Sequence, residues 1–317
     1  MNTDSTIIQL EQVSKRFGSK LAVNPISLKI DRGSIVAILG PNGAGKTTTL
    51  NMMLGLSTPS SGEVTVLGMP PGHRQVRERI GVMLQDVSVM DGLTVREIIR
   101  MVRSYYPTPL DADKIEALTG LRPEDLNRRA EKLSGGQKRS LNFALAMAGD
   151  PDVLFFDEPT VGLDSETRRY FWKQIRQLAQ HGKTILFTTH YLQEADEAAD
   201  RIILFAGGSI IADGTPDRIK SGIAKRTLSF SLPGGQLDNG LVTPDAAPPD
   251  IRIQIEDLPG VERIEYRKER CILHTQDTDA LIRVIITRQL PVREIRIETG
   301  QLDDAYATLL ETMKEEH

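Results

Sequence analysis

Nine consecutive residues of this 317-residue chain have the types and spacing of a phosphate-binding loop. They are Gly40, Pro41, Asn42, Gly43, Ala44, Gly45, Lys46, Thr47 and Thr48, and the first eight match the pattern G-x-x-x-x-G-K-[ST]. Glycine has no Cβ, so successive backbone N–H groups can point at phosphate oxygens, and the start of the following helix adds partial positive charge. We expect Lys46 to bridge the β- and γ-phosphates of a nucleotide and Thr47 to bind Mg²⁺. The apolar run before the loop and the helical run after it favour this interpretation over a glycine-rich turn.

A second group of candidate residues lies where an apolar run ends in two acids. Val153–Phe156 is followed by Asp157 and Glu158, and in a parallel sheet ligands gather at the carboxyl ends of the strands. We expect Asp157 to complete the Mg²⁺ shell, directly or through water. Glu158 is then placed to act on the water that attacks the γ-phosphate, as general base or as orienting group. The alternative, a strand that ends in acidic surface residues, is disfavoured because the same chain carries a phosphate loop.

The run Leu133–Gln137, with the sequence LSGGQ, predicts a second anion site. Ser134 is a suitable N-cap for a helix that begins near Lys138, and the two glycines expose backbone amides at the positive end of that helix. One ATP molecule does not need two such sites on the same face. We therefore expect a second copy of the chain to use this site.

With these residues in place, the chain from Ile7 to about Lys220 resembles the ATP-binding cassette (ABC) ATPases, and LSGGQ is similar to their signature motif. In that family two protomers close head-to-tail. The resemblance implies that each ATP lies between the phosphate loop of one copy and Ser134, Gly136 and Gln137 of the other. Hydrolysis then removes the γ-phosphate and lets the halves separate, which in the family usually moves a pair of membrane domains.

Four further residues take their expected roles from this resemblance. Phe17 corresponds to the ring that stacks on adenine, with Phe in place of the commoner Tyr, and Gln85 to the loop that links Mg²⁺ and the attacking water to the membrane partner. Asp164 corresponds to a loop that crosses the dimer, and His190 to a switch that touches the γ-phosphate. Taken singly, Phe17, Gln85 and His190 fit core packing or a solvated loop as well. The expected catalytic residues are Glu158, His190 and Gln85, and the expected Mg²⁺ ligands are Thr47, Gln85 and Asp157.

The pattern of apolar runs indicates the elements that position these residues. Short, continuous runs predict strands buried on both faces of a mostly parallel sheet, namely Ile35–Leu39, Ile80–Leu84, Val153–Phe156, Thr184–Thr188 and Arg201–Phe205. Alternation in Ile7–Val13 and Ile26–Ile30 predicts an antiparallel β lobe. The stretch Asp91–Ala130 predicts a small helical lobe inserted between two strands of the sheet. With the resemblance, these features predict an α/β fold for residues 1–223, the P-loop NTPase fold of an ABC ATPase domain with a mixed sheet.

A change of composition after Ile223 predicts a second domain, small and α+β, over residues 224–317. The Gly- and Pro-rich stretch Leu232–Pro249 indicates a loop, and the run Ile251–Ile255 fits either a strand or a helix. The other expected elements are a hairpin of Ile264–Arg267 and Cys271–Thr275, a capped helix at Asp277–Arg288, a strand at Val292–Ile297 and a closing helix at Leu302–Met313. The resemblance implies a role for this domain in dimerisation, docking or regulation.

Composition argues against several other classes of function. A net charge of -4 and a pI near 5.8 argue against a nucleic-acid partner. A single cysteine, Cys271, leaves no disulfide framework and no multi-thiolate metal site. The apolar runs are far shorter than the ~20 residues that span a bilayer, and the start of the chain carries no secretory signal. We therefore expect a chain in the cytosol, held at the cytoplasmic face of the membrane by a separate transmembrane permease.

Some details resemble the branch of the family that serves drug, antibiotic and lipid exporters with a separately encoded permease. They are Gly55–Gly62 with Val66–Gly68, Thr160–Asp164 and Thr189–Leu192. This resemblance implies an exporter subunit, with an importer subunit as the alternative. A soluble ABC ATPase that acts on ribosomes or chromosomes is a further alternative, but the chain carries one cassette and no long coiled coil. A regulator without turnover is disfavoured by the presence of Asp157 and Glu158.

Overall fold

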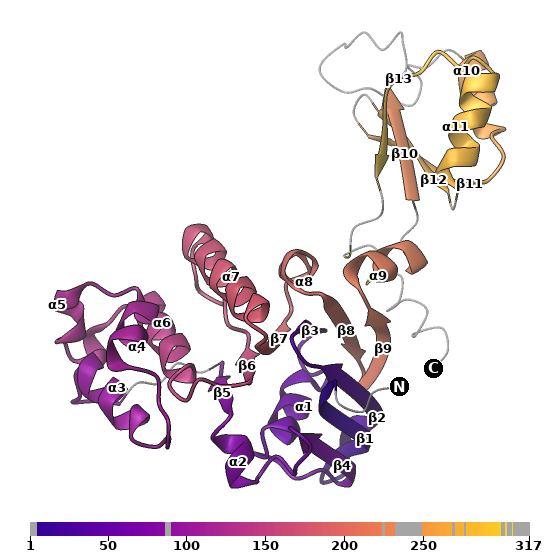
Figure 1. Ribbon diagram of the computed structural model, residues 1–317. Helices are drawn as coiled ribbons and strands as arrows, with labels where there is room; N and C mark the ends of the chain where they lie inside the picture. Colours follow the sequence, from indigo (N-terminus) through magenta and orange to yellow (C-terminus); the bar gives the residue numbers. More distant parts are fainter. Residues whose placement is uncertain are drawn as a thin grey trace. The chain divides into compact units, whose positions relative to one another are not determined.

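The computed structural model describes residues 5–85, 90–223, 226–231, 249–267, 270–275 and 277–298, together with Leu302 and Tyr306. The chain divides into two compact units, Met1–Pro216 and Asp217–His317, each of which is described by itself (Figure 1). This division lies at the start of helix α9 (Pro216–Ile223), whereas the sequence predicted a boundary at its end, residue 223. Within the described ranges, no helix is both long enough and apolar enough to cross a bilayer.

The first unit is built around a six-stranded sheet with the strand order β5-β6-β7-β3-β8-β9. Its strands are β3 (Ile35–Leu39), β5 (Ile80–Met83), β6 (Val153–Asp157), β7 (Thr184–Thr189), β8 (Arg201–Ala206) and β9 (Ser209–Gly214). The first five run parallel to one another, as predicted, whereas β9 pairs antiparallel with β8 and was not predicted. Every residue of β3, β6 and β7 is buried, which confirms strands covered on both faces.

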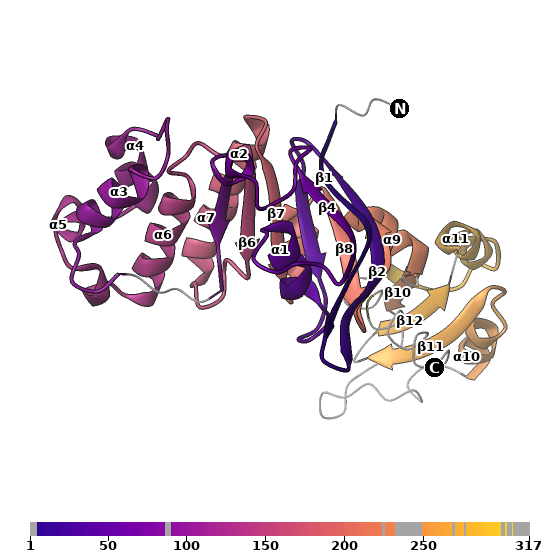
Figure 2. The ribbon, with the colours of Figure 1, turned by 90° about the horizontal axis from the view of Figure 1, so that it is seen from below.

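A smaller antiparallel sheet, with the order β2-β1-β4, confirms the predicted β lobe. It consists of β1 (Thr6–Phe17), β2 (Lys20–Asp31) and β4 (Ser61–Val66). The polar start of β4 concealed it in the sequence, and Gly62 is required there because a Cβ would lie 2.3 Å from the Gln12 carbonyl oxygen. Helix α1 (Lys46–Met53) lies between the two sheets, and its Leu50 and Met53 share one core with both of them (Figure 2).

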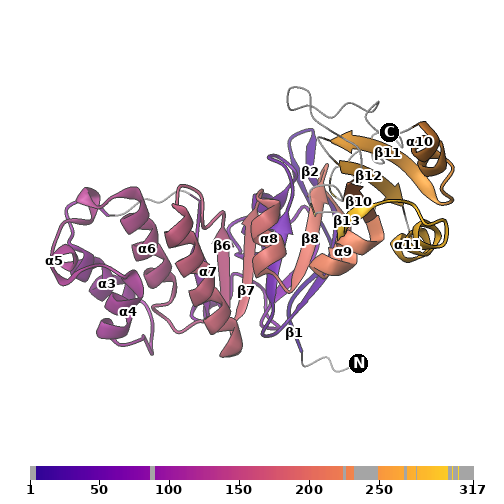
Figure 3. The same cartoon turned by 90° about the horizontal axis from the view of Figure 1, so that it is seen from above.

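Helices cover the opposite face of the six-stranded sheet and form the inserted lobe. Helix α7 (Ser165–Gln180) and helix α8 (Leu192–Ala198) lie on the face away from α1 (Figure 3). On that face the rings of Phe156 and Phe171 are 5.8 Å apart, and those of Trp172 and Phe187 are 4.6 Å apart. Between β5 and β6, the predicted helical lobe has its own core and comprises α3 (Val95–Arg103), α4 (Ala112–Thr119), α5 (Pro123–Leu126) and α6 (Gly135–Ala146). A short helix, α2 (Arg74–Arg77), precedes β5.

After α9, the described residues between 226 and 298 of the second unit have the element order β-α-β-β-α-β. Its elements are β10 (Arg226–Ser231), α10 (Pro249–Glu256), β11 (Val261–Arg267), β12 (Arg270–Thr275), α11 (Thr278–Thr287) and β13 (Arg293–Glu298). The strands form one antiparallel sheet with the order β11-β12-β10-β13. Element order and strand order together define the ferredoxin-like split βαβ arrangement, which confirms the predicted α+β class.

Most of the elements predicted for this unit are present. The hairpin, the strand and the Asp277-capped helix are confirmed, since the Asp277 carboxylate accepts a hydrogen bond from the Ala280 amide at 2.9 Å. The run Ile251–Ile255, whose sequence fitted either a strand or a helix, is helical. Strand β10 was not predicted, although it lies at the centre of the sheet. The expected loop at Leu232–Pro249 lies outside the described residues except for Pro249, which begins α10, and the closing helix at 302–313 lies outside them except for Leu302 and Tyr306.

Candidate functional site

The phosphate loop leaves the carboxyl end of β3 and leads directly into α1. Gly43 and Gly45 have positive φ angles of 81° and 102°, a conformation that favours glycine. Gly40 has no room for a side chain, because a Cβ would lie 2.3 Å from the carbonyl oxygen of Phe205. Gly45 is the N-cap of α1, and no side chain caps this end. The first N–H groups of the helix are therefore left to an anion.

Lys46 is buried at the centre of the loop. Its Nζ donates hydrogen bonds to the carbonyl oxygens of Gly40 at 2.6 Å and Pro41 at 3.1 Å. Burial lowers the pKa of the Lys46 amine, and the negative charges of Glu158 and Asp157 partly oppose this shift. The loop thus holds one cation between its own carbonyls and the two acids at the end of β6, Asp157 and Glu158.

Asp157 and Thr47 place oxygen atoms side by side next to the loop. The hydroxyl of Thr47 lies 3.4 Å from Asp157 Oδ1, and the hydroxyl of Thr188 on the neighbouring strand β7 donates to the same oxygen. A hydroxyl and a carboxylate are the hard oxygen ligands that Mg²⁺ prefers. One carboxylate leaves most of the coordination shell to water and substrate phosphates, which is the usual arrangement at Mg²⁺–nucleotide sites. The donor set therefore fits Mg²⁺.

Glu158 is held by strand β7 and faces His190. Its backbone N–H donates to the Thr188 hydroxyl at 3.0 Å, and its φ angle of 48° turns the chain sharply after β6. One carboxylate oxygen of Glu158 lies 3.0 Å from His190 Nδ1. A positive φ in a residue with a Cβ stores strain that is concentrated at functional sites. The two side chains form a carboxylate–imidazole pair at the edge of the sheet.

Arg139 on α6 is a residue of the site that the sequence reasoning did not identify. Its guanidinium donates to the carbonyl oxygens of Glu158 at 2.9 Å and Gln85 at 3.2 Å. Burial lowers the pKa of Arg139, and the charge of Glu158 partly offsets this. In the part of the chain that the structure describes, no carboxylate lies within 4 Å of this guanidinium. Its partners are backbone carbonyls, so no side-chain pattern could have indicated it.

A cavity of about 530 Å³ brings most of the predicted nucleotide residues together. Its lining includes Phe17, Asn42, Gly43, Gly45, Lys46, Thr47, Thr48, Gln85 and Glu158. Phe17 is 54% exposed at the end of β1, and the Lys15 Nζ lies 5.0 Å from the centre of its ring. The cavity therefore offers an exposed ring, a cradle for phosphates and a carboxylate, the three kinds of group that bind and hydrolyse a nucleotide.

The signature residues do not line this cavity. Ser134 and Gln137 form a capping box at the start of α6, with hydrogen bonds of 3.0 and 3.2 Å between side chain and backbone. The Gln137 side chain also donates to the buried carboxylate of Asp125 at 3.3 Å. A Cβ on Gly136 would meet nothing within 4 Å. The predicted second anion site is thus an open helix end whose shape is set by its own residues.

Asp164 also lies away from the cavity and caps α7. Its carboxylate accepts hydrogen bonds from the backbone N–H groups of Glu166 at 3.0 Å and Thr167 at 2.9 Å. These bonds and that of the Thr167 hydroxyl lower the pKa of Asp164.

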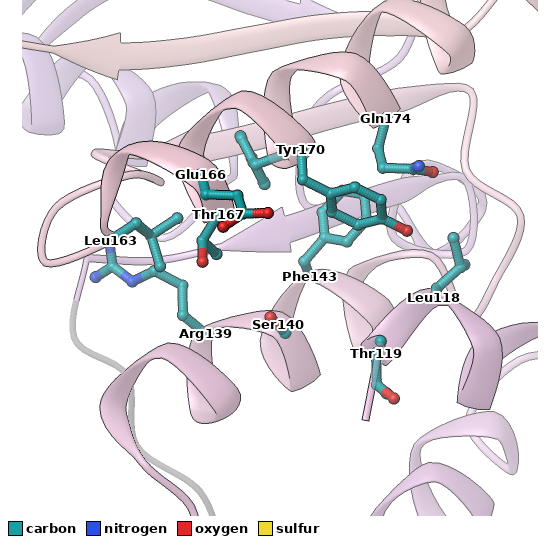
Figure 4. A pocket seen from close by; sticks show the side chains of 12 residues that line it. Leu118, Thr119, Arg139, Ser140, Phe143, Leu163, Glu166, Thr167, Tyr170 and Gln174 are labelled. Carbon is teal, nitrogen blue, oxygen red and sulfur yellow. The ribbon is translucent and has the colours of Figure 1, made fainter. Parts of the chain in front are cut away.

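A second cavity, of about 450 Å³, lies between the start of α7 and helices α4 and α6 (Figure 4). Arg139 and Leu163 lie at one end of it, and Tyr170 projects over it.

Fold and site together define a P-loop ATPase, and comparison with known proteins identifies the family to which it belongs. A profile described as ABC transporter matches residues 23–161. The Nod factor export ATP-binding protein I of Burkholderia orbicola is 41% identical over 215 residues, which cover 66% of this chain and 71% of that protein. The protein of the same name from Rhizobium etli is 40% identical over 219 residues, 67% of this chain and 69% of that protein.

Solved structures agree with this placement. A dimeric bacterial ABC transporter cassette has a TM-score of 0.60 and 27% identity, and covers 66% of this chain and 98% of its own. The same cassette in a post-hydrolysis state, bound to ADP and Pi, has a TM-score of 0.60 and 26% identity. The chain belongs to the ABC transporter family, as an ATP-binding protein that hydrolyses ATP. The recognition from sequence motifs is thereby confirmed.

Proposed function

We propose that two copies of this chain bind two ATP molecules head-to-tail and use their hydrolysis to power a separate membrane permease that exports its substrate. One observation carries the proposal. The phosphate loop, Phe17, Gln85 and Glu158 share one cavity, whereas Ser134 and Gly136 lie on an open helix end that this cavity does not include. Such a division suits two half-sites on different copies. A similar cassette solved as a dimer supports it.

The residues in and next to the cavity then have distinct tasks in hydrolysis. Lys46 and the N-terminus of α1 bind the phosphates. Thr47 and Asp157 would hold Mg²⁺, with Gln85 as a further expected ligand, and the ion would neutralise charge on the phosphates. Glu158 orients the attacking water or accepts its proton, and His190, 3.0 Å away, holds the carboxylate in place.

The test of this assignment is Glu158→Gln. The amide keeps the shape of the side chain but cannot accept a proton, so ATP should bind while steady-state phosphate release falls by at least about a hundredfold. Light scattering should show a stable dimer with ATP that separates slowly. Glu63→Gln, at an exposed position of strand β4, is the matched control and should behave as wild type. Full ATPase activity of Glu158→Gln would refute the role that we propose for Glu158.

A groove next to Gln85 supports docking of the permease on this unit. It has a volume of about 680 Å³ and lies between the end of β5 and the helical lobe. Its lining includes the exposed side chains of Leu56 and Leu84, together with Val102 and Tyr106. Exposed apolar side chains around a hollow are typical of protein interaction sites. An apolar segment of the permease is the occupant we propose, because the groove is lined by Leu84, the residue directly before Gln85.

The groove can be tested without disturbing hydrolysis. Leu56→Asp places a charge in the apolar groove, so co-purification of the hydrophobic permease chain should be lost while the ATPase activity of the chain alone is unchanged. Leu56→Met is the conservative control and should retain the complex. Co-purification of Leu56→Asp with an intact permease would contradict this site.

Export is favoured over import because the similar proteins are named for Nod factor export. We propose a location at the cytoplasmic face of the membrane, through the permease. Transport by inside-out vesicles that contain the complex distinguishes the two directions, since an exporter accumulates substrate in their lumen when ATP is added outside. Extrusion from such vesicles would instead identify an importer subunit.

A further inference from the structure

One buried acid on α8 has no role in the function described so far. The described residues include four acidic side chains with less than a tenth of their surface exposed, namely Asp125, Asp157, Glu158 and Glu194. Glu158 lines the cavity, Asp157 lies beside the Thr47 hydroxyl of the phosphate loop, and Asp125 accepts a hydrogen bond from Gln137 of the signature. Glu194 is 5% exposed and lies four residues after His190. A carboxylate taken out of water at this position requires compensating partners.

The Glu194 carboxylate binds three side chains from three different segments. One of its oxygens accepts a hydrogen bond from the Thr160 hydroxyl at 2.6 Å, and the other accepts from the Thr189 hydroxyl at 3.3 Å. The Nε of Arg168 on α7 lies 3.2 Å from the first oxygen, as an ion pair. Both threonines are themselves buried.

These partners flank the catalytic pair on both sides. Thr160 follows Glu158 by two residues, and Thr189 directly precedes His190. A single carboxylate therefore ties together the two segments that bring Glu158 and His190 within 3.0 Å. The Thr189 hydroxyl also accepts a hydrogen bond from the Tyr191 backbone N–H at 3.0 Å, so this hydroxyl is fixed both as a donor and as an acceptor.

Arg168 extends the same network to the loop that carries Asp164. Its guanidinium lies over the ring of Tyr191, 5.6 Å from the ring centre, and its Nη2 lies 3.4 Å from the carbonyl oxygen of Leu163. The segment after Glu158, the segment around His190 and the start of α7 thus share one buried charge. Because the three segments belong to one hydrogen-bonded network, we expect a displacement of one segment to shift the other two.

We propose that Glu194 is a positioning residue for ATP hydrolysis, which holds Glu158 and His190 in register by binding Thr160 and Thr189. This inference rests on the proposed roles of Glu158 and His190. The carboxylate is essential because it only accepts hydrogen bonds, and all three partners present donors. An amide of the same shape would lose the charge that pairs with Arg168 and would turn its N–H₂ group toward a hydroxyl that now donates, so one hydrogen bond must reverse and one of the segments is displaced.

The test is Glu194→Gln in the full chain. We expect kcat for ATP hydrolysis to fall by about tenfold, because small displacements of reacting groups have effects of this size. The KM for ATP should change by less than about twofold, because Glu194 does not line the cavity. Glu197→Gln is the matched control on the same helix, where the exposed carboxylate meets Gln193 at 2.8 Å, and should be unchanged. An unchanged kcat in Glu194→Gln overturns the proposal.

A second measurement separates positioning from loss of stability. In a His190→Ala background the additional effect of Glu194→Gln should nearly vanish, because residues that act as one unit are not additive. A full tenfold loss in that background would show an independent structural effect and refute the inference. If Glu194→Gln does not fold, Thr160→Val is the second variant. It removes one of the hydrogen bonds of Glu194 and should lower kcat without changing the KM for ATP. Full activity of Glu158→Gln would instead refute the proposed function, so the two failures are distinguishable.

Discussion

The cavity end and the signature end of the first unit are built in different ways. At the cavity, the catalytic groups follow buried strands, and Asp157 and Glu158 are fixed by hydroxyls of the neighbouring strand β7. At the signature, Ser134 and Gln137 satisfy each other at an exposed helix end, and Gly136 faces open space. One end is therefore organised before any ligand binds, and the other presents backbone N–H groups to a partner.

This difference indicates a division of labour between two copies. Buried polar groups with fixed partners position a reaction precisely, because they lose little freedom when the substrate binds. An open helix end can approach and leave a phosphate, because nothing of its own chain covers it. ATP can thus join two copies, and the loss of its γ-phosphate can release them.

The largest expected effect comes from disabling each end separately and then mixing the variants. Lys46→Ala removes the central cation of the cavity, and Gly136→Asp places a negative charge where a phosphate should approach. Each variant alone should lose at least about a hundredfold in ATPase activity. A Cβ at Gly136 meets no neighbour within 4 Å, so this variant should fold normally.

An equal mixture of the two variants should regain activity. Mixed dimers have one intact site, made from the cavity of the Gly136→Asp copy and the signature of the Lys46→Ala copy. If the copies exchange freely, about a quarter of the wild-type activity should return. Phosphate release from the mixture, compared with the sum of the separate variants, is the measurement. No gain above that sum would show that both ends act within one copy.

An intermediate effect is expected from Arg139, which joins α6 to the cavity. Arg139→Gln removes the guanidinium that holds the Glu158 and Gln85 carbonyls, so the carboxylate should shift from its productive position. We expect kcat to fall by on the order of tenfold, with a smaller change in the KM for ATP. Steady-state kinetics over a range of ATP concentrations separates the two parameters.

A matched control for this variant lies in the helical lobe. Arg103 also donates to a backbone carbonyl, that of Leu110, at 2.7 Å. Arg103→Gln loses the same kind of hydrogen bond away from the cavity, and should leave kcat unchanged. Equal losses of kcat in both variants would mean that Arg139 only stabilises the lobe.

The contrast between Lys46 and Arg139 explains how far the sequence could predict the site. Lys46, Asp157 and Ser134 stand in local patterns, because the backbone geometry of a phosphate loop or a helix cap is encoded within a few residues. Arg139 meets Gln85, 54 positions away in the chain, through a backbone carbonyl. Glu194 likewise meets Thr160 from 34 positions away. Such contacts depend on tertiary packing, which no local pattern contains.

The fold shows the same limit at its strands. The continuous apolar runs of β3, β6 and β8 were predicted because they are buried on both faces. Strands β4 and β10 were missed, since their polar residues mask the signal. In β10, Leu228 and Phe230 fill the core while serines and a threonine alternate with them. Only the pairing partners on either side show that this segment is central.

The smallest expected effect concerns Asp164, which caps α7 outside the cavity. Asp164→Ala removes the acceptor for the Glu166 and Thr167 N–H groups, so the first unit should unfold about 1–3 °C lower at neutral pH. Because the bonds lower the pKa of Asp164, its stabilisation is present above the ordinary value of 3.8 and is lost as the pH falls through the lower folded value. Fluorescence of the single tryptophan, Trp172 on α7, reports the transition. The difference between variant and wild type should shrink in acid, and a constant difference would show that the charge of Asp164 does not stabilise the helix.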